Sequence, residues 1–273
     1  MRQSFLVQMV EREDLMNAIA LNSSMFNGAR IIGPAVAGLL VAAIGEGWCF
    51  FANGVSYIAV IAGLVMMSPR TVAPQSISSS PLANIMEGFR YVAHTAPIRA
   101  LLLLLGLASF AGMPYTVLMP VFADDIFHSG ARGLGILMGA SGVGALIGSV
   151  LLAIRQTVRG LGTWVAVASA SFGLFAIGFA FSRSFLLSVI MLVPVGVAMM
   201  VQMASSNTLI QSMVPDVLRG RVMAVYSMMY VGLGPIGALI AGALAHRIGA
   251  PKTVAAGGVL TMLGAIAFAV RLP

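Results

Sequence analysis

Near its start the chain reads Asn22-Ser-Ser-Met-Phe-Asn27-Gly28-Ala-Arg30-Ile-Ile-Gly33-Pro34-Ala-Val-Ala-Gly38, and this stretch opens an apolar run that continues to Ile44. The run predicts a membrane helix that contains one full positive charge, Arg30. A charge at the bilayer centre costs about 2.5–3.5 kcal/mol on insertion scales, so Arg30 should face a protein interior or a watery cavity. Gly33 and Pro34 follow within one turn, and proline removes a backbone donor and bends a helix. The stretch therefore predicts a kinked helix that lines a path through a membrane.

The composition of the whole chain agrees with a membrane protein. Of its 273 residues, 59% are hydrophobic and only 8% are charged, whereas a soluble domain has about 25% charged residues. So little polar surface cannot face water on all sides, and we expect an all-α integral membrane protein in a lipid bilayer. The single cysteine, Cys49, excludes an intramolecular disulfide and a cysteine metal cage. The net charge of +7 resides mostly in short connections, which favours membrane orientation over nucleic-acid binding.

Eight apolar runs are long enough to span a bilayer, which takes about 20 residues. The one long connection, 68–97, contains several prolines and the run Ser78-Ser79-Ser80, so it predicts a linker that ends in a short amphipathic piece, Leu82–His94. The sequence thus predicts two parts, 1–67 and 98–273, on either side of this linker. The eight predicted spans cover approximately 16–44, 48–67, 99–121, 133–154, 161–181, 185–207, 221–245 and 253–270.

Basic residues in the connections predict the orientation. With eight crossings, ten Lys and Arg residues fall on the side that holds Met1 and four on the other side, while Arg30 lies inside a helix. An excess of Lys and Arg marks the cytoplasm. Both termini and the linker 68–97 are therefore expected to be cytoplasmic, in the inner membrane of a cell. A miscounted helix would instead place the linker and the C-terminal tail on opposite sides.

The two ends of the chain resemble each other. Each end has a Gly-Pro pair inside a predicted helix and a glycine where that helix ends. These are Gly33-Pro34 with Gly45, and Gly234-Pro235 with Gly249. Parts that recur with the same orientation signal a parallel internal repeat, as in one class of transporter. The first and second predicted helices match the seventh and eighth. A repeat unit of six helices would therefore leave four helices missing before Met1.

Three stretches resemble the major facilitator superfamily, in particular its drug-efflux and enterobactin-exporter branch. The glycines around Gly33-Pro34, from Gly28 to Gly38, are similar to the antiporter motif in the fifth helix of proton-coupled exporters. The stretch Pro215-Asp216-Val-Leu-Arg219-Gly220-Arg221 resembles the cytoplasmic loop before the eleventh helix. The stretch Arg155-Gln-Thr-Val-Arg159 resembles the gating loop between helices eight and nine.

This resemblance implies a bundle equivalent to helices five to twelve of a twelve-helix fold, with residues 1–67 as the last two helices of the first half. It implies alternating-access efflux of small amphiphilic molecules, drugs or siderophores, coupled to protons. The residues themselves show no phosphate-binding loop, serine elbow or zinc signature, so we expect no enzyme activity, cofactor or metal site. The missing helices would be supplied by a further N-terminal segment.

Polar residues inside the predicted helices are the candidates for a substrate cavity. Arg30 can pair with an anionic substrate or with an acid of another helix, or it can extend to the surface. For the uncharged residues the alternative is an ordinary interhelical hydrogen bond. Gln202 is the first choice, because it follows Pro194 and Gly196 on a helix that should be kinked. The full set is Asn27, Arg30, Asn53, Tyr115, Gln202, Asn207, Tyr226 and Tyr230.

Glycines and prolines inside the predicted helices are the candidates for kinks and gating. The fourth span also contains Gly135-x-x-x-Gly139 and Gly144-x-x-x-Gly148, which predict a close-packing surface, either static or sliding. The kink candidates are Gly33, Pro34, Gly38, Pro194, Gly234 and Pro235, and the candidates in cytoplasmic loop motifs are Arg155, Arg159, Asp216, Arg219 and Arg221.

Two other classes of protein remain as alternatives. The first is a truncated, non-transporting fragment, or a half that folds only beside a partner chain. The second is a membrane enzyme, which would need a buried cluster of acids or bases. Asp124, Asp125 and His128 form the one acidic cluster near a membrane face, and they fall in a short outer connection where a solvated turn is expected.

Overall fold

The structure, a computed structural model, describes residues 36, 40, 44–66, 81–155, 157 and 159–270. These residues are helical apart from short connections, and no strand occurs among them. The chain divides into two compact units, Met1–Ser78 and Ser79–Pro273. The division falls inside the predicted linker, 68–97.

In the first unit one helix is described over its full length, α3 (Glu46–Val65). The segment Gly47–Met66 is long and apolar enough to cross a membrane. The predicted span 16–44 lies outside the described residues, apart from residues 36, 40 and 44. The site and kink candidates that fall outside with it are Asn27, Arg30, Gly33, Pro34 and Gly38.

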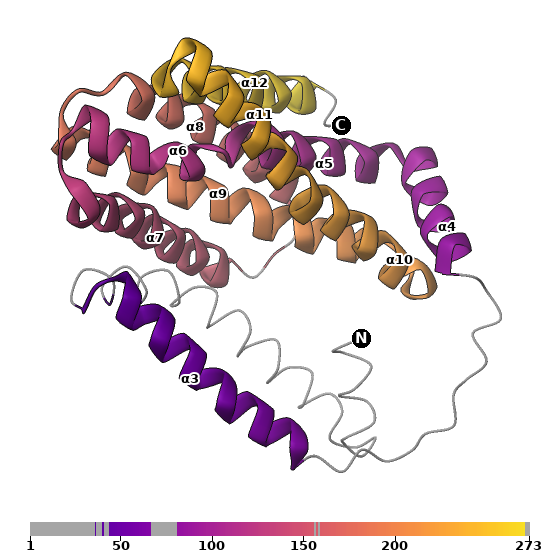
Figure 1. Cartoon of the computed structure of the whole chain (residues 1–273). Helices are drawn as coiled ribbons and strands as arrows, with labels where there is room; N and C mark the ends of the chain where they lie inside the picture. The colour runs from indigo at the N-terminus through magenta and orange to yellow at the C-terminus, as the bar shows by residue number, and fades with distance from the viewer. Residues whose placement is uncertain are drawn as a thin grey trace. The chain divides into compact units, whose positions relative to one another are not determined.

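The second unit is a bundle of long helices (Figure 1). It begins with the short helix α4 (Pro81–His94). Two of its long helices are interrupted by π-helical segments, labelled η. The first comprises α5 (Ala96–Leu107), η1 (Ala108–Gly112), α6 (Tyr115–Val121) and η2 (Phe122–Ile126), and the second comprises α10 (Asp216–Ser227), η3 (Met228–Gly232) and α11 (Leu233–Ile248). The other long helices are α7 (Gly130–Ile154), α8 (Leu161–Phe181), α9 (Phe185–Met213) and α12 (Ala250–Val270).

Within the described ranges, seven helices are long and apolar enough to cross a membrane. They correspond to seven of the eight predicted spans, and the remaining one is the span 16–44. Helix α8 has the predicted bounds, 161–181, and α4 covers the predicted amphipathic piece. The predicted all-α membrane architecture is confirmed.

Two predicted ends were wrong because helices continue through polar residues. The span predicted to end at residue 121 continues to Ile126, so Asp124 and Asp125 lie in π-helical η2 instead of a loop. The span predicted to end at residue 207 continues to Met213. There the side-chain amide of Gln211 donates to the side-chain oxygen of Asn207, one turn earlier, which supports the helix beyond its apolar part.

A third error concerns the motif around Asp216. The helix predicted to begin at residue 221 begins at Asp216, directly after Pro215. Proline is tolerated at a helix start because the first N–H groups have no intrahelical partner. A carboxylate in the first turn is also favourable against the helix dipole. Asp216, Arg219 and Arg221 therefore lie on the first turns of α10 and not in a loop.

The turns before α3 and α12 have the same backbone form. Gly45 has φ 81° and ψ 163°, and Gly249 has φ 90° and ψ 151°. Each glycine carbonyl accepts the N–H four residues later, from Cys49 at 3.3 Å and from Thr253 at 3.2 Å. This match agrees with the predicted repeat of the two chain ends.

We expect Gly249→Ala to destabilise the protein by about 1–3 kcal/mol, because only glycine adopts this backbone region without strain. A Cβ at Gly249 would meet nothing closer than Cδ of Pro251 at 3.8 Å, so strain and not a clash is the cause. Gly242→Ala in α11 is the matched control, because a Cβ there enters open space and alanine favours the helix. Thermal unfolding of the purified variants is the measurement, and equal melting temperatures would contradict the expectation.

Helices α7 and α9 approach each other through bare backbone. A Cβ on Gly144 or on Gly196 would lie 1.9 Å from a backbone carbonyl oxygen of the facing helix, and one on Gly148 would lie 2.8 Å from another. By contrast, a Cβ on Gly139 would enter open space. The glycine pair at 144 and 148 thus forms the close contact, whereas the glycine at 139 does not contribute to it.

Candidate functional site

Two apolar clusters fill the second unit, one toward each end of its long helices. On α9 the first cluster includes Leu192, Val195 and Ala198, and the second includes Ile210. The other long helices follow the same order, because α6 and the end of α8 contribute to the first cluster, and α5 and the start of α8 contribute to the second. Gln202 lies on α9 between the two clusters, at mid-depth in the bundle.

Gln202 lines a small cavity. The cavity measures about 10 Å³, roughly the space that one water molecule needs. Two other polar residues, Ser109 and Tyr230, line it. The rest of its wall is apolar or contains sulfur, from Leu105, Ala108, Met113, Phe172, Met199 and Met203.

Unpaired polar groups gather on α9 beside this cavity. Gln202 is 5% exposed, and its Nε2 has no hydrogen-bond partner in the described part of the chain. One turn further on, the buried hydroxyls of Ser205 and Ser206 also have none there. A buried polar group without a partner costs about 1–3 kcal/mol. This face of α9 can therefore form hydrogen bonds with a ligand, which would compensate for that cost.

Two π-helical segments meet next to the cavity. Ser109 in η1 and Tyr230 in η3 each lie five residues before a proline, Pro114 and Pro235. A π-helix pairs each carbonyl with the N–H five residues later, and proline has no N–H, so neither carbonyl can receive that bond. The hydroxyl of Ser109 donates to the carbonyl oxygen of Tyr230 at 2.6 Å. This hydrogen bond joins the two interruptions at mid-depth.

Aromatic rings continue the site on two sides. The rings of Tyr226 and Tyr230 are stacked with centroids 6.3 Å apart, and the hydroxyl of Tyr226 donates to the carbonyl of Met203 at 3.4 Å. Tyr115 lies outside the cavity, with its hydroxyl 3.0 Å from Oγ of Ser141. Its ring packs edge-to-face against Phe172, which lines the cavity. The site is thus a polar layer with aromatic and methionine walls.

Comparison with known proteins identifies the family. Residues 2–273 match the sequence profile of the transmembrane secretion effectors, a family of the major facilitator superfamily. The chain belongs to this family. The resemblance stated from the sequence motifs is confirmed, and this chain is a multi-pass membrane protein.

Several named transporters are similar to this chain. It is 26% identical over 264 residues to the staphyloferrin A transporter of Staphylococcus aureus, covering 96% of this chain and 65% of that protein. It is 27% identical over 258 residues to the multidrug efflux pump Tap of Mycolicibacterium fortuitum, covering 93% and 63%. It is 26% identical over 259 residues to the enterobactin exporter EntS of Escherichia coli, covering 92% and 59%. The chain thus spans about two thirds or less of these relatives' length.

A solved structure has the same fold. It is a bacterial homologue of the human lysosomal transporter Spinster, in an inward-facing and unoccupied conformation. The TM-score is 0.54 with 17% sequence identity, and the match covers 98% of this chain and 71% of that one. At this identity the likeness supports the major facilitator fold alone.

The structure brings some of the predicted site residues together and separates others. Gln202, Tyr226 and Tyr230 lie at or beside the polar cavity. Asn207 pairs with Gln211 toward the end of α9, away from the cavity lining. The remaining candidates lie elsewhere: Asn53 is on α3 in the first unit, Pro194 lines a separate apolar groove, and Gly234 and Pro235 follow η3 in the first turn of α11.

Three serines of the polar layer were not predicted from the sequence. Serine is common in membrane helices, so the residue type alone does not mark Ser109, Ser205 or Ser206. The spacing of Ser109 to Pro114 repeats that of Tyr230 to Pro235, and this signal was present in the sequence. Ser205 and Ser206 are distinguished by burial, which depends on the neighbouring helices.

At another place an ion pair joins the linker helix α4 to a predicted motif. Nη1 of Arg221 on α10 lies 2.6 Å from Oε2 of Glu87 on α4. The two side chains are 28% and 51% exposed, so the ion pair is worth at most about 1 kcal/mol. Close backbone packing adds to it, because a Cβ on Gly88 would lie 2.8 Å from the carbonyl oxygen of Arg221. The motif on α10 therefore serves as a contact surface for α4.

Proposed function

We propose that this chain forms part of an exporter that moves small amphiphilic molecules, drugs or siderophores, out of the cell by alternating access. The observation that carries the proposal is the polar layer around Gln202, which lies at mid-depth between two apolar clusters. Substrate sites of secondary transporters lie near the bilayer midplane. The names of the relatives, a staphyloferrin A transporter, an enterobactin exporter and a multidrug efflux pump, support these substrate classes.

In this proposal Gln202 donates a hydrogen bond to the substrate, and Tyr230 contributes a ring to the same surface. The methionines Met113, Met199 and Met203 form an adaptable apolar wall, because their unbranched side chains fit ligands of different shape. The cavity of about 10 Å³ is far smaller than the roughly 300–1,000 Å³ of ordinary ligand sites. Substrate binding therefore requires the helices around Gln202 to separate, and the interruptions η1 and η3 are the places where they bend.

The orientation in the membrane and the energy source are proposed from the charges of the connections and from the family. We place both termini and the linker 68–97 in the cytoplasm, with residues 1–67 completing the first half of the fold and 98–273 forming the second half. Arg30 and Asn27 would line the first half's side of the path. Protons would drive export by binding to an acidic residue. That residue would lie in the part of the related proteins that this chain does not span. The protein would transport its substrate without changing it chemically.

The test is efflux from bacterial cells that lack their own exporters. The cells express this chain alone or a version extended by the coding sequence upstream of Met1, and we measure secreted siderophore and retained fluorescent dye. We expect export from at least one version and its loss when the proton gradient is dissipated. If both versions reach the membrane and neither exports any compound, the proposed function is wrong.

A further inference from the structure

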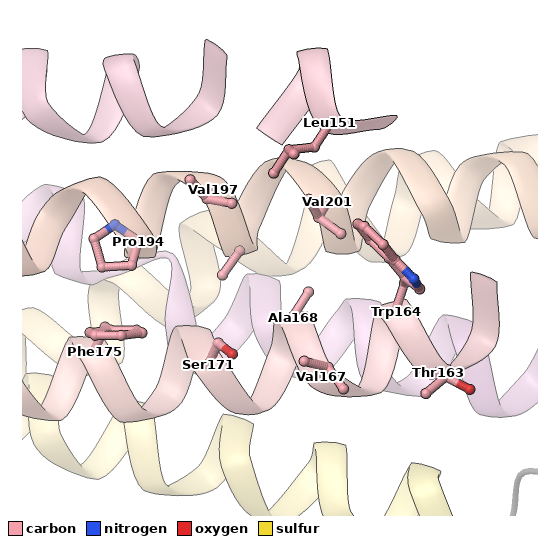
Figure 2. Close-up of a pocket in the computed structure, with 11 residues that line it drawn as sticks. Leu151, Thr163, Trp164, Val167, Ala168, Ser171, Phe175, Pro194, Val197 and Val201 are labelled. Carbon is pink, nitrogen blue, oxygen red and sulfur yellow. The ribbon is translucent and has the colours of Figure 1, made fainter. Parts of the chain in front are cut away.

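A second hollow lies on the surface formed by α7, α8 and α9. It is an open apolar groove of about 380 Å³, and it shares no lining residue with the polar cavity. Figure 2 shows Leu151, Val197 and Val201 along one side of this groove, and Trp164 and Val167 along the other. Val167 is 59% exposed although its side chain is apolar. The groove therefore fits a long apolar ligand that approaches from the lipid.

The length of the groove matches one leaflet of a bilayer. Trp164 lies at one end, and Phe175 and Pro194 lie at the other (Figure 2). The helix from Trp164 to Phe175 rises about 16 Å at roughly 1.5 Å per residue. Half of a hydrocarbon core about 30 Å thick is about 15 Å. A single acyl chain can therefore occupy the groove from the membrane interface to the bilayer centre.

A positive charge marks the interfacial end of the groove. The guanidinium of Arg155 lies over the ring of Trp164, 4.9 Å from its centroid. Its Nε donates to the carbonyl of Thr157 at 3.2 Å, and another nitrogen donates to the carbonyl of Arg159. These partners are neutral, and among the described residues no carboxylate forms an ion pair with Arg155. The loop thus holds a cation, without an ion-pair partner among the described residues, beside the aromatic residue that typically anchors at the membrane interface.

We propose that this groove binds one anionic diacyl phospholipid, with an acyl chain between α7, α8 and α9 and the phosphate against Arg155. A guanidinium forms strong, charge-assisted hydrogen bonds to phosphate. The lipid belongs to the leaflet in which α8 begins, which is the cytoplasmic one in the orientation proposed above. It bridges the end of α7 and the start of α8, so it stabilises the second unit. The site does not depend on which substrate is exported.

The test measures lipid retention by the purified full chain with native mass spectrometry, using phosphatidylglycerol and phosphatidylcholine as probes. We expect preferential retention of phosphatidylglycerol. Arg155→Gln should weaken it about fivefold, the factor that corresponds to about 1 kcal/mol for one basic residue at an anionic surface. Val167→Trp should fill the groove and remove the bound lipid. Leu174→Trp is the matched control, because Leu174 is 58% exposed on the same helix and does not line the groove.

Three outcomes would overturn the proposal. The first is equal retention by Val167→Trp and Leu174→Trp, and the second is no preference for phosphatidylglycerol over phosphatidylcholine. The third is full displacement of the lipid by inorganic phosphate or by an exported dye, which would assign the groove to a free anion or to the substrate. If Arg155→Gln fails to fold, the two tryptophan variants decide the question alone.

Discussion

Gly144→Ala is expected to destabilise the protein by about 3 kcal/mol and to reduce the amount of folded chain in the membrane severalfold. Its Cβ would lie 1.9 Å from the carbonyl oxygen of Val193 and 2.9 Å from the backbone nitrogen of Val197. Both atoms belong to the backbone of α9, so no side-chain rotation relieves the clash, and the two helices must separate. Overpacking of a well-packed interior typically costs 1–3 kcal/mol, and backbone obstruction places this case at the upper end.

The control for this variant lies on the same helix. A Cβ on Gly139 has no atom within 4 Å, so Gly139→Ala should keep or raise stability through the better helix propensity of alanine. Melting temperatures of the two variants in one detergent provide the comparison. If Gly144→Ala melts at the temperature of Gly139→Ala, the close approach of α7 and α9 is not present in the protein.

Gln202→Leu is expected to reduce export at least tenfold while the protein stays as stable as the unmodified chain or becomes more stable. The side chain is buried and its Nε2 has no partner in the described part of the chain, so its removal relieves a penalty of about 1–3 kcal/mol. A buried residue outside the substrate path would show the same change in stability and unchanged export. Loss of export without loss of stability therefore distinguishes a ligand contact from a packing residue.

Ser188→Ala is the matched control for Gln202→Leu. Ser188 is also buried on α9, and its hydroxyl has no hydrogen-bond partner among the described residues, but it does not line the polar cavity. Its replacement should change stability in the same direction and leave export unchanged. Efflux rates and melting temperatures of both variants are the measurements. Normal export by Gln202→Leu would remove Gln202 from the substrate path.

Much of the fold could be predicted because the residues in most connections differ clearly from those in the helices. Helix α8 has the predicted bounds because Gly160 precedes it in the left-handed conformation and a short serine-rich turn follows it. The end of α9 was harder to predict, because the residues around Asn207 are polar and still helical. The π-helical segments were not predicted, since a change of hydrogen-bond register has no residue-type signature of its own.

The candidate site was predicted in part, from a different feature than the one that marks it in the structure. Gln202 was chosen because it follows Pro194 and Gly196, and in the structure Pro194 lines the outer groove and Gly196 packs against the backbone of α7. Gln202 is distinguished by its burial between two apolar clusters, with no partner for Nε2 among the described residues, and burial depends on contacts that no local pattern encodes. The roles of these residues in binding stay predictions.

At Tyr230 the main chain and the side chain take part in different contacts, and the hydrogen bond from Ser109 involves the main chain. The acceptor is the main-chain oxygen of residue 230, whereas the ring of the same residue stacks on Tyr226, and the residue lines the cavity. Under the proposed function, a change of side chain at position 230 would alter which cargo is recognised and leave the main-chain link between η1 and η3 in place. Exporters built in this way would diverge in cargo range at this position without having to rebuild that connection.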